Sequence, residues 1–147
     1  MQVKVTPAPV ARMHFMLVAS TTLAEHHRRC DNLFGAARAA ADAANWSLLA
    51  RRMEALRETM LAHFRHEEER IFPLYEETSG EEGATEYLCA QHDDMRAALW
   101  VLATLKPEAE SARYCTELAA LQAAFDAHAA DEETRMYPVF EKMLGRR

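Results

Sequence analysis

Two stretches of the chain each place a histidine four residues before a glutamate, with a proline six residues after the glutamate. The first stretch contains His63 and Glu67, and the second contains His128 and Glu132. Side chains four residues apart are neighbours on one face of a helix, so each pair could bind the same ligand. Imidazole nitrogen and carboxylate oxygen atoms together suit iron, manganese or zinc. The spacing therefore indicates a candidate metal site.

These stretches belong to a repeat that covers most of the chain. Shifting the sequence by 65 residues aligns chemically matching side chains without a gap. Packing alone would not keep polar residues in register, so the repeat predicts two similar helix pairs related by a pseudo-twofold axis. The same register selects His27, and not its neighbour His26, as the counterpart of His92. The aligned polar and proline pairs are His27 with His92, His63 with His128, Glu67 with Glu132, Glu68 with Glu133, and Pro73 with Pro138.

Apolar residues precede the histidines in steps of three and four, the spacing of a helix face directed at a bundle core. Leu23 precedes His27 and Leu88 precedes His92 in this way. Every predicted helix therefore directs one histidine inward, and two helices add a glutamate one turn later. The two longest apolar series are Met53, Leu56 and Met60 before His63, and Leu118, Leu121 and Phe125 before His128.

The first helix is predicted to follow an N-terminal arm. Thr22 and Glu25 form a capping-box pattern, so this helix is expected to begin at about residue 23 and to run to about residue 44. Residues 1–20 are expected to form the arm, which is extended at its start. Its apolar run 13–18 is expected to pack across the bundle, with a dimer contact as the alternative.

Prolines mark the boundaries of the other helices. Pro73 and Pro138 must each bend or end a helix because proline lacks the backbone donor, whereas Pro107 suits the first position of the fourth helix. Short connections between long helices place consecutive helices antiparallel. We therefore predict an all-α, antiparallel up-down-up-down four-helix bundle over about residues 21–145, within one domain of residues 1–147. The later helices are expected over 47–72, 86–105 and 107–137, with a loop over 78–85.

A bundle core does not tolerate acidic side chains without a partner. An unpaired buried carboxylate costs several kcal/mol, and no lysine or arginine shares the apolar face at the level of Glu67 and Glu132. Metal ions would neutralise these charges. A coherent arrangement has two iron ions, each held by two histidines, with both glutamates and an oxo or hydroxo group as bridges; manganese and zinc are the alternatives. The predicted ligands are His27, His63, Glu67, His92, His128 and Glu132.

These motifs resemble those of the hemerythrin-like family, also called HHE cation-binding domains. The resemblance extends over nearly the whole chain beyond residue 20. It implies a four-helix bundle around a non-haem di-iron site that binds dioxygen or a related small ligand. The matching stretches are His27-Arg-Arg-Cys-Asp, His63-Phe-Arg-His-Glu67-Glu followed by Ile-Phe-Pro, Gln-His92, and His128-Ala-Ala-Asp-Glu132-Glu followed by Met-Tyr-Pro.

Two positions depart from the oxygen-carrying members of that family. Those proteins have a second histidine four residues after the one that matches His92, where this chain has Arg96, and an aspartate where this chain has Glu133. Glu132 instead follows the pattern of the wider HHE group. With two six-coordinate iron ions, the predicted ligands and one bridging oxygen group leave two coordination positions open. The oxygen carriers leave one. Wider access favours oxygen sensing, or reaction with oxygen, peroxide or nitric oxide, over reversible carriage alone.

Three functional hypotheses follow from these patterns. The first is binding of a small ligand at a di-iron centre for sensing, transport or scavenging. The second is a di-iron enzyme that acts on peroxide or nitric oxide, and the third is a bundle with a zinc or vestigial site. The sequence leaves three roles open for four further polar residues: a supplementary ligand, a hydrogen-bond partner of a ligand, or a solvated edge. These residues are His26, His66, Glu68 and Glu133.

Composition limits the partner and the compartment. With 23 acidic and 17 basic side chains, the net charge of -6 argues against a nucleic-acid partner and an anionic membrane surface, so we expect a small diatomic ligand or peroxide. Three cysteines in helical sequence argue against a disulfide framework and for a reducing compartment. The run 13–18 is too short to span a bilayer. We predict a cytoplasmic protein that is a monomer or a homodimer.

Overall fold

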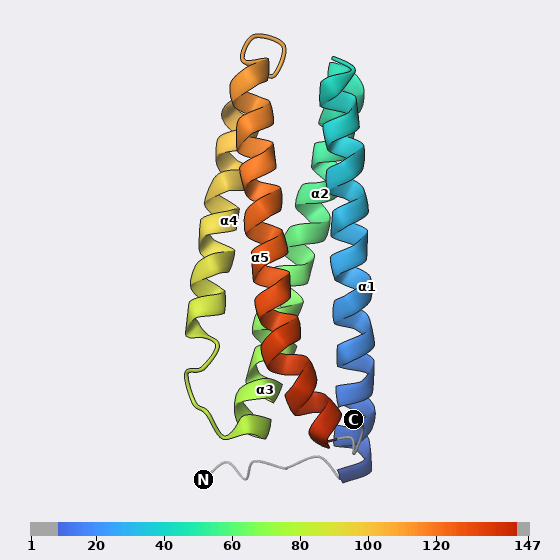
Figure 1. Ribbon diagram of the computed structural model, residues 1–147, viewed down its shortest axis with the longest axis vertical. Coiled ribbons are helices and arrows are strands. Elements are labelled where there is room, and N and C mark those ends of the chain that lie inside the picture. Colours follow the sequence, from blue (N-terminus) through green and yellow to red (C-terminus); the bar gives the residue numbers. More distant parts are fainter. Residues whose placement is uncertain (1–8, 144–147) are drawn as a thin grey trace.

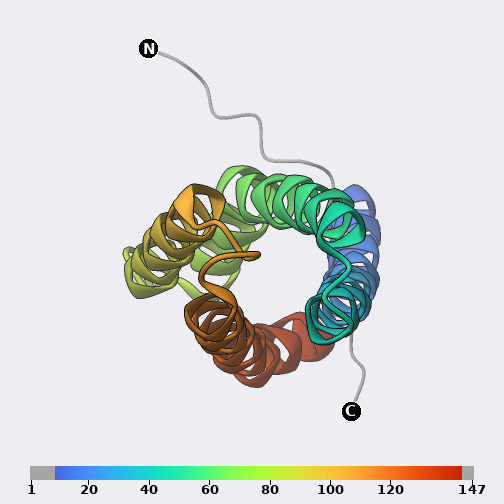
Figure 2. The ribbon, with the colours of Figure 1, turned by 90° about the horizontal axis from the view of Figure 1, so that it is seen from above.

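The chain folds into four long helical segments around a common core. The computed structural model describes residues 9–143, with side chains from residue 23 onward. Consecutive segments run in opposite directions, and seen from above they enclose one core (Figures 1 and 2). The predicted all-α bundle is therefore confirmed. The helices are α1 (Pro9–Asp42), α2 (Trp46–His66), the π-helical turn η1 (Glu67–Ile71), α3 (Phe72–Ser79), α4 (Glu86–Thr104) and α5 (Ser111–Met143).

Helix α1 begins earlier than the sequence predicts. It starts at Pro9 and continues to Asp42, so the prediction of an arm is wrong for residues 9–20, and the capping-box pattern at Thr22 lies inside a helix. Proline is favoured at the first helical position, and the alanine, methionine, leucine and arginine residues that follow have high helix propensity. The predictions for residues 1–8 and for the packing of side chains 13–18 lie outside what the structure describes.

The second helical segment does not end at Phe72. α2, η1 and α3 follow one another without a gap, and in η1 the backbone N–H of Phe72 donates to the carbonyl of Glu67. Pro73 then lies in the first turn of α3, where a missing backbone donor is tolerated. The helical segment therefore extends to Ser79. Single π-helical turns are uncommon and often occur at functional sites, and Glu67 is the first residue of this one.

Helix α5 begins at Ser111 and not at Pro107. The residues before it form a separate turn around Pro107, in which the Glu110 backbone N–H donates to Lys106 O at 2.8 Å. The Lys106 backbone N–H in turn donates to Glu110 Oε2 at 3.2 Å. Because these bonds close the turn on itself, the regular helix starts only after it.

Helix α5 also continues through Pro138, so the prediction that it ends near residue 137 is wrong. Proline removes one backbone hydrogen bond and bends a helix, but it does not end a helix whose two sides are held by packing. Met136 and Phe140 on either side of Pro138 are both fully buried. The last turns of α5 lean toward α1 in Figure 1.

Short connections join the other helices close to the predicted positions. Asn45 caps α2, because its side chain accepts a hydrogen bond from the Leu48 backbone N–H at 3.3 Å. Gly80 ends α3 with a φ of 73°, a conformation that glycine adopts without strain. Glu76 Oε1 then accepts hydrogen bonds from Thr85 N at 3.1 Å and Thr85 Oγ1 at 2.8 Å. These two bonds attach the end of α3 to the start of α4.

The buried apolar side chains form two clusters with a polar layer between them. The larger cluster includes Phe34, Phe64 and Phe125, and the smaller one includes Ile71 and Phe140. The polar layer lies within one turn of both clusters along α2 and α5. Its members are all buried, namely His27, His63, Glu67, His92, His128 and Glu132. No helix in the described part of the chain is long and apolar enough to cross a membrane.

Candidate metal centre

The structure brings all six predicted ligands together in the bundle core. They form two overlapping groups whose donor atoms lie within 4.8 Å of one another, and every member is buried. Glu67 and Glu132 belong to both groups. The groups differ in their histidines, which define two half-sites: the His27 half-site holds His27 and His63, and the His92 half-site holds His92 and His128.

The Nε2 atoms of the histidines point at the two shared carboxylates. Glu67 Oε1 lies 3.0 Å from His63 Nε2, 3.1 Å from His92 Nε2 and 3.6 Å from His128 Nε2. Glu132 Oε2 lies 3.5 Å from His27 Nε2, and Glu132 Oε1 contacts His128 Nε2. Each carboxylate therefore lies against histidines from both half-sites, which is where a bridging ligand belongs.

Two imidazole nitrogens in this layer face each other at a short distance. His92 Nε2 and His128 Nε2 are 3.0 Å apart. The opposite nitrogens of these rings lie on acceptors, His92 Nδ1 at 3.2 Å from Glu68 Oε1 and His128 Nδ1 at 2.7 Å from Gln91 Oε1. We assign the ring protons to the Nδ1 atoms on that ground. The Nε2 atoms then present two opposed lone pairs, which a bound metal ion would accept.

The layer also contains buried polar atoms without a hydrogen bond of acceptable geometry. A buried polar atom without a partner costs roughly 1–3 kcal/mol, so a cluster of them is unfavourable unless an ion is bound. Nitrogen and oxygen atoms in this arrangement are the donors of a metal site, and the residues therefore fit one. The atoms are His27 Nε2, His63 Nε2, Glu67 Oε2, Glu132 Oε1 and Glu132 Oε2.

Burial determines which protonation states the cluster adopts without metal. It lowers the pKa of His63 well below its usual value, and burial together with His128 lowers the pKa of His92 to about 4. Both rings are therefore neutral near pH 7 and offer a lone pair. Burial lowers the pKa of His27 as well, but the nearby carboxylates of Glu132 and Glu133 outweigh burial and raise that pKa.

The two shared carboxyl groups do not carry equal charge in the absence of metal. Burial and the charge of Glu132 raise the pKa of Glu67 well above its usual value. Burial also disfavours the charge on Glu132, but the close approach of Glu67, His128 and His27 outweighs burial and lowers its pKa. Glu67 therefore favours its protonated form in the absence of metal. Metal binding would displace this proton, because ligating carboxylates must be deprotonated.

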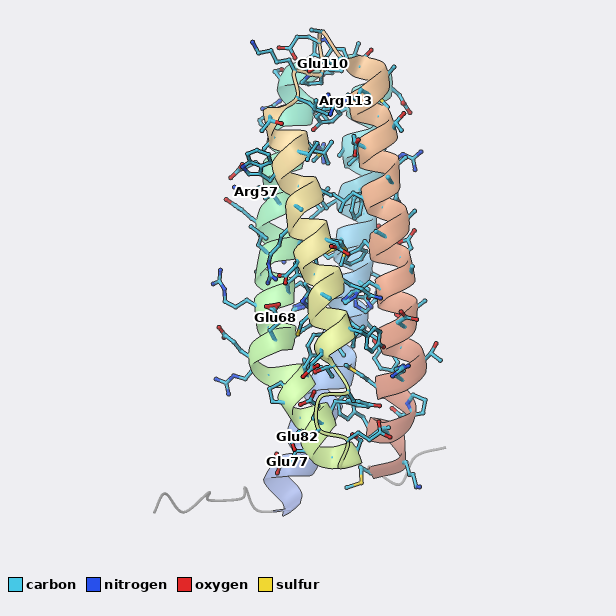
Figure 3. All side chains as sticks on the ribbon, turned by 90° about the vertical axis from the view of Figure 1, so that its left-hand side faces the viewer. Arg57, Glu68, Glu77, Glu82, Glu110 and Arg113 are labelled. Carbon is cyan, nitrogen blue, oxygen red and sulfur yellow. The ribbon has the colours of Figure 1, made fainter. Side chains whose placement is uncertain are left out.

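The outer edge of one imidazole in each half-site is held by a carboxylate. His27 Nδ1 lies 3.1 Å from Glu133 Oε1, and His92 Nδ1 lies 3.2 Å from Glu68 Oε1. Glu68 and Glu133 match in the 65-residue repeat, so the internal symmetry extends beyond the six buried residues. Glu68 lies about midway along the bundle in Figure 3. Of the roles left open by the sequence, the structure supports a hydrogen-bond partner of an imidazole for both glutamates.

A second repeated pair holds the other two imidazoles. His63 Nδ1 lies 3.1 Å from His26 Nδ1, and His128 Nδ1 lies 2.7 Å from Gln91 Oε1. Gln91 is a functional residue that the sequence did not predict. The signal was present, since Gln91 is the counterpart of His26 in the 65-residue register. His66 lies behind His26, with a distance of 5.8 Å between ring centroids, and takes part in neither donor group.

Arg96 occupies the position at which oxygen carriers have a further histidine, and it binds an acidic side chain and not the cluster. Its Nη2 lies 2.7 Å from Glu68 Oε2 and its Nη1 lies 3.0 Å from Glu68 Oε1. Nη1 also donates to Asp93 Oδ1 at 2.9 Å. The guanidinium group lies 5.5 Å from the centre of the Phe64 ring. Arg96 therefore holds a hydrogen-bond partner of His92 in place.

Aromatic rings and a cavity surround the cluster. Phe64 stacks on His92 with ring centroids 4.2 Å apart, and Phe72 is stacked at 5.4 Å from the same ring. A cavity of about 300 Å³ lies between α4 and α5 and reaches His128 and Gln91. Alanines form much of its wall, namely Ala98, Ala120, Ala124 and Ala127. A larger cavity of about 500 Å³, lined mainly by residues of α2 and α4, touches none of the six buried residues.

Comparison with protein families agrees with this geometry. The family model described as the hemerythrin HHE cation binding domain matches residues 18–140, which include all six residues of the cluster. Comparisons with curated proteins and with solved structures give no match. The family match and the buried cluster of histidines and glutamates together indicate a metal-binding site. The chain belongs to the hemerythrin family of HHE cation-binding domains.

Proposed function

We propose that this protein is a non-haem di-iron protein that binds dioxygen or a related small ligand, in sensing, transport or scavenging. One observation carries the proposal: Glu67 and Glu132 are shared by two donor groups that each contain two further histidines. A single ion would leave one pair of histidines without a partner. Two ions use all six side chains, with the glutamates as bridges.

The donor set supports iron as the metal. Four imidazoles and two carboxylates provide the mixed nitrogen and oxygen ligation that iron accepts, while manganese and zinc remain alternatives that metal analysis distinguishes. Two bound iron ions would supply a centre that exchanges electrons with a small ligand. Each half-site offers two histidines and two shared carboxylates, which leaves coordination positions for such a ligand.

The surroundings of the cluster support a small ligand. His92 lies between the rings of Phe64 and Phe72, which exclude water from that side. The cavity between α4 and α5 has walls of alanine and carries the acidic side chains Asp94 and Glu117. A small neutral molecule is compatible with this cavity, whereas a large or anionic one is disfavoured. We also propose a cytoplasmic protein, monomeric or homodimeric, without a nucleic-acid or membrane partner.

Metal analysis tests the proposal directly. Protein purified from iron-supplemented cells should contain about two irons per chain and absorb light through charge transfer from a bridging oxygen to iron. Metal-free protein, or one zinc per chain, would contradict a di-iron centre. His63→Ala and His128→Ala should each reduce the iron content, because each removes one ligand of a different half-site.

A di-iron enzyme that acts on peroxide or nitric oxide is the second candidate. The open coordination positions favour it, because both reactions need room for a ligand beside the bridging groups. Anaerobic reduction followed by titration with air and with nitric oxide, monitored by absorption spectroscopy, separates the two functions. A stable spectrum that reverses when oxygen is removed supports ligand binding, and sustained consumption of peroxide or nitric oxide supports turnover.

A further inference from the structure

The two half-sites have equal ligands but unequal surroundings. In each, a glutamate accepts the Nδ1 proton of one histidine: Glu133 for His27 and Glu68 for His92. The negative charge of Glu68 is paired with a positive one, because Arg96 donates hydrogen bonds to both oxygens of Glu68. The oxygen that accepts from His92 is one of these two. The acceptor of His92 is therefore already partly neutralised.

The corresponding glutamate in the other half-site has no such cation among the residues whose side chains the structure describes. Glu133 has a side chain that is 47% exposed, and among the described residues it pairs only with His27. The residue that matches Arg96 in the 65-residue register is Asp31. The first half of the repeat therefore has an acidic residue at the position where the second half has a basic one. Burial and the nearby Asp126 raise the pKa of Asp31, so a second acidic side chain lies close to Asp31.

A hydrogen-bonded carboxylate makes an imidazole a stronger metal ligand, because it draws the Nδ1 proton and increases the electron density at Nε2. Among the described residues no cation pairs with Glu133 beside His27, whereas Arg96 partly neutralises the charge of Glu68 beside His92. Arg96 also repels a second cation at the His92 half-site through its own charge. Both effects weaken metal binding on the same side.

We infer that the two half-sites bind metal unequally, with the first ion entering the His27 half-site and Arg96 setting the difference. This inference rests on the proposed dinuclear centre. Hydrogen-bond partners of metal ligands typically change metal affinity by about 10–100-fold, so we expect the two dissociation constants to differ by at least about tenfold. Arg96 acts through Glu68 and is a positioning residue.

Titration of the metal-free full-length protein with Co²⁺, in competition with a chelator, tests the inference. Bound Co²⁺ is followed by its visible absorption, which requires no activity. The native protein should bind Co²⁺ in two steps of different affinity. In crystals prepared with one equivalent of Co²⁺, the anomalous X-ray signal should lie between His27 and His63. Equal steps, or a first ion at His92 and His128, would overturn the inference.

Arg96→Gln provides the decisive variant, since it removes the cation and keeps a donor toward Glu68. The second step should tighten about tenfold and the first should change little. Arg113→Gln is the control: Arg113 lies 3.9 Å from Glu110 in a more exposed pair at one end of the bundle, away from Glu68 (Figure 3). It removes the same charge and should leave both steps unchanged.

Glu133→Gln tests the His27 half-site, because it should weaken the affinity of the first Co²⁺ binding step about tenfold. A weaker second step in Arg96→Gln would mean that Arg96 mainly orients Glu68, and would overturn the inference. Native protein that binds two equal Co²⁺ ions contradicts this inference alone. Native protein that binds no Co²⁺ contradicts the proposed function as well.

Discussion

Gln91 Oε1 accepts a hydrogen bond from His128 Nδ1 at a distance of 2.7 Å. The amide nitrogen of Gln91 lies on the other side, 3.4 Å from Asp131 Oδ2, so the side chain is held at both ends. The amide oxygen therefore keeps the Nδ1 proton of His128 in place and leaves Nε2 free to bind metal. The other three imidazoles have Glu133, His26 and Glu68 in the comparable place.

Replacing Gln91 should weaken metal binding in the His92 half-site without unfolding the protein. We expect Gln91→Leu to lower the affinity for one of two ions by about 10–100-fold, because the Nδ1 proton of His128 loses its acceptor. Gln91→His is the matched control, since it installs the residue type that His26 provides in the other half. Metal titration should show near-native affinity for Gln91→His, and equal losses in both variants would contradict this role.

The shared glutamates should behave differently from the histidines when they are removed. Glu67 belongs to both donor groups, so we expect Glu67→Ala to lose both ions, whereas His128→Ala should lose mainly one. Metal analysis after exhaustive dialysis measures the difference. Retention of one tightly bound ion in Glu67→Ala would show that this glutamate does not bridge.

The contact between Glu76 and Thr85 should give the fold a small pH dependence away from the metal cluster. Hydrogen bonds from Thr85 lower the pKa of Glu76, so the folded state favours the charged carboxylate. Its contribution is fully present above the unfolded-state pKa and is lost as the pH falls through the lowered folded-state pKa. Urea unfolding of native protein and Glu76→Gln at several pH values measures this contribution, and the difference between them should shrink in acid.

Thr85→Val offers an independent test of the same contact. It removes the hydroxyl donor at 2.8 Å but keeps the shape of the side chain, and we expect a loss of about 1 kcal/mol in the free energy of unfolding near neutral pH. If Thr85→Val is as stable as the native protein, the hydroxyl does not attach α3 to α4.

The cavity between α4 and α5 should control how fast a small ligand reaches the centre. Ala98→Leu adds bulk to a wall that leads to His128, so we expect association of nitric oxide with the reduced iron protein to slow several-fold, with metal content unchanged. Ala103→Leu is the matched control on the same helix, because Ala103 lines the other cavity. Stopped-flow measurements compare the two variants. Equal association rates would show that the ligand enters elsewhere.

Much of the centre was predictable because residues that lie four positions apart in the sequence lie on the same face of a helix. His63 and Glu67 lie four residues apart on one segment, and the 65-residue register places His128 and Glu132 in the same way on another. The structure brings these residues together with His27 and His92 in one buried layer. The choice of His27 over His26 came from the same register, and His26 lies at the outer nitrogen of His63.

Helix boundaries were less predictable, since local signals compete with packing. The capping-box pattern at Thr22 has no effect inside a longer helix, and buried neighbours carry α5 through Pro138. The π-helical turn that begins at Glu67 is also absent from the matching stretch of α5, although the two stretches share their motif. Identical local patterns thus adopt different backbones when their surroundings differ.

The amino-acid sequence by itself determined the helical class, the internal repeat and the six side chains that converge, because periodicity and register are properties of each helix. Only the tertiary structure decided what lies behind each imidazole: Gln91 behind His128, and Glu68 with Arg96 behind His92. Those contacts join residues of different helices. They depend on the distance and rotation at which neighbouring helices pack, which no single helix specifies.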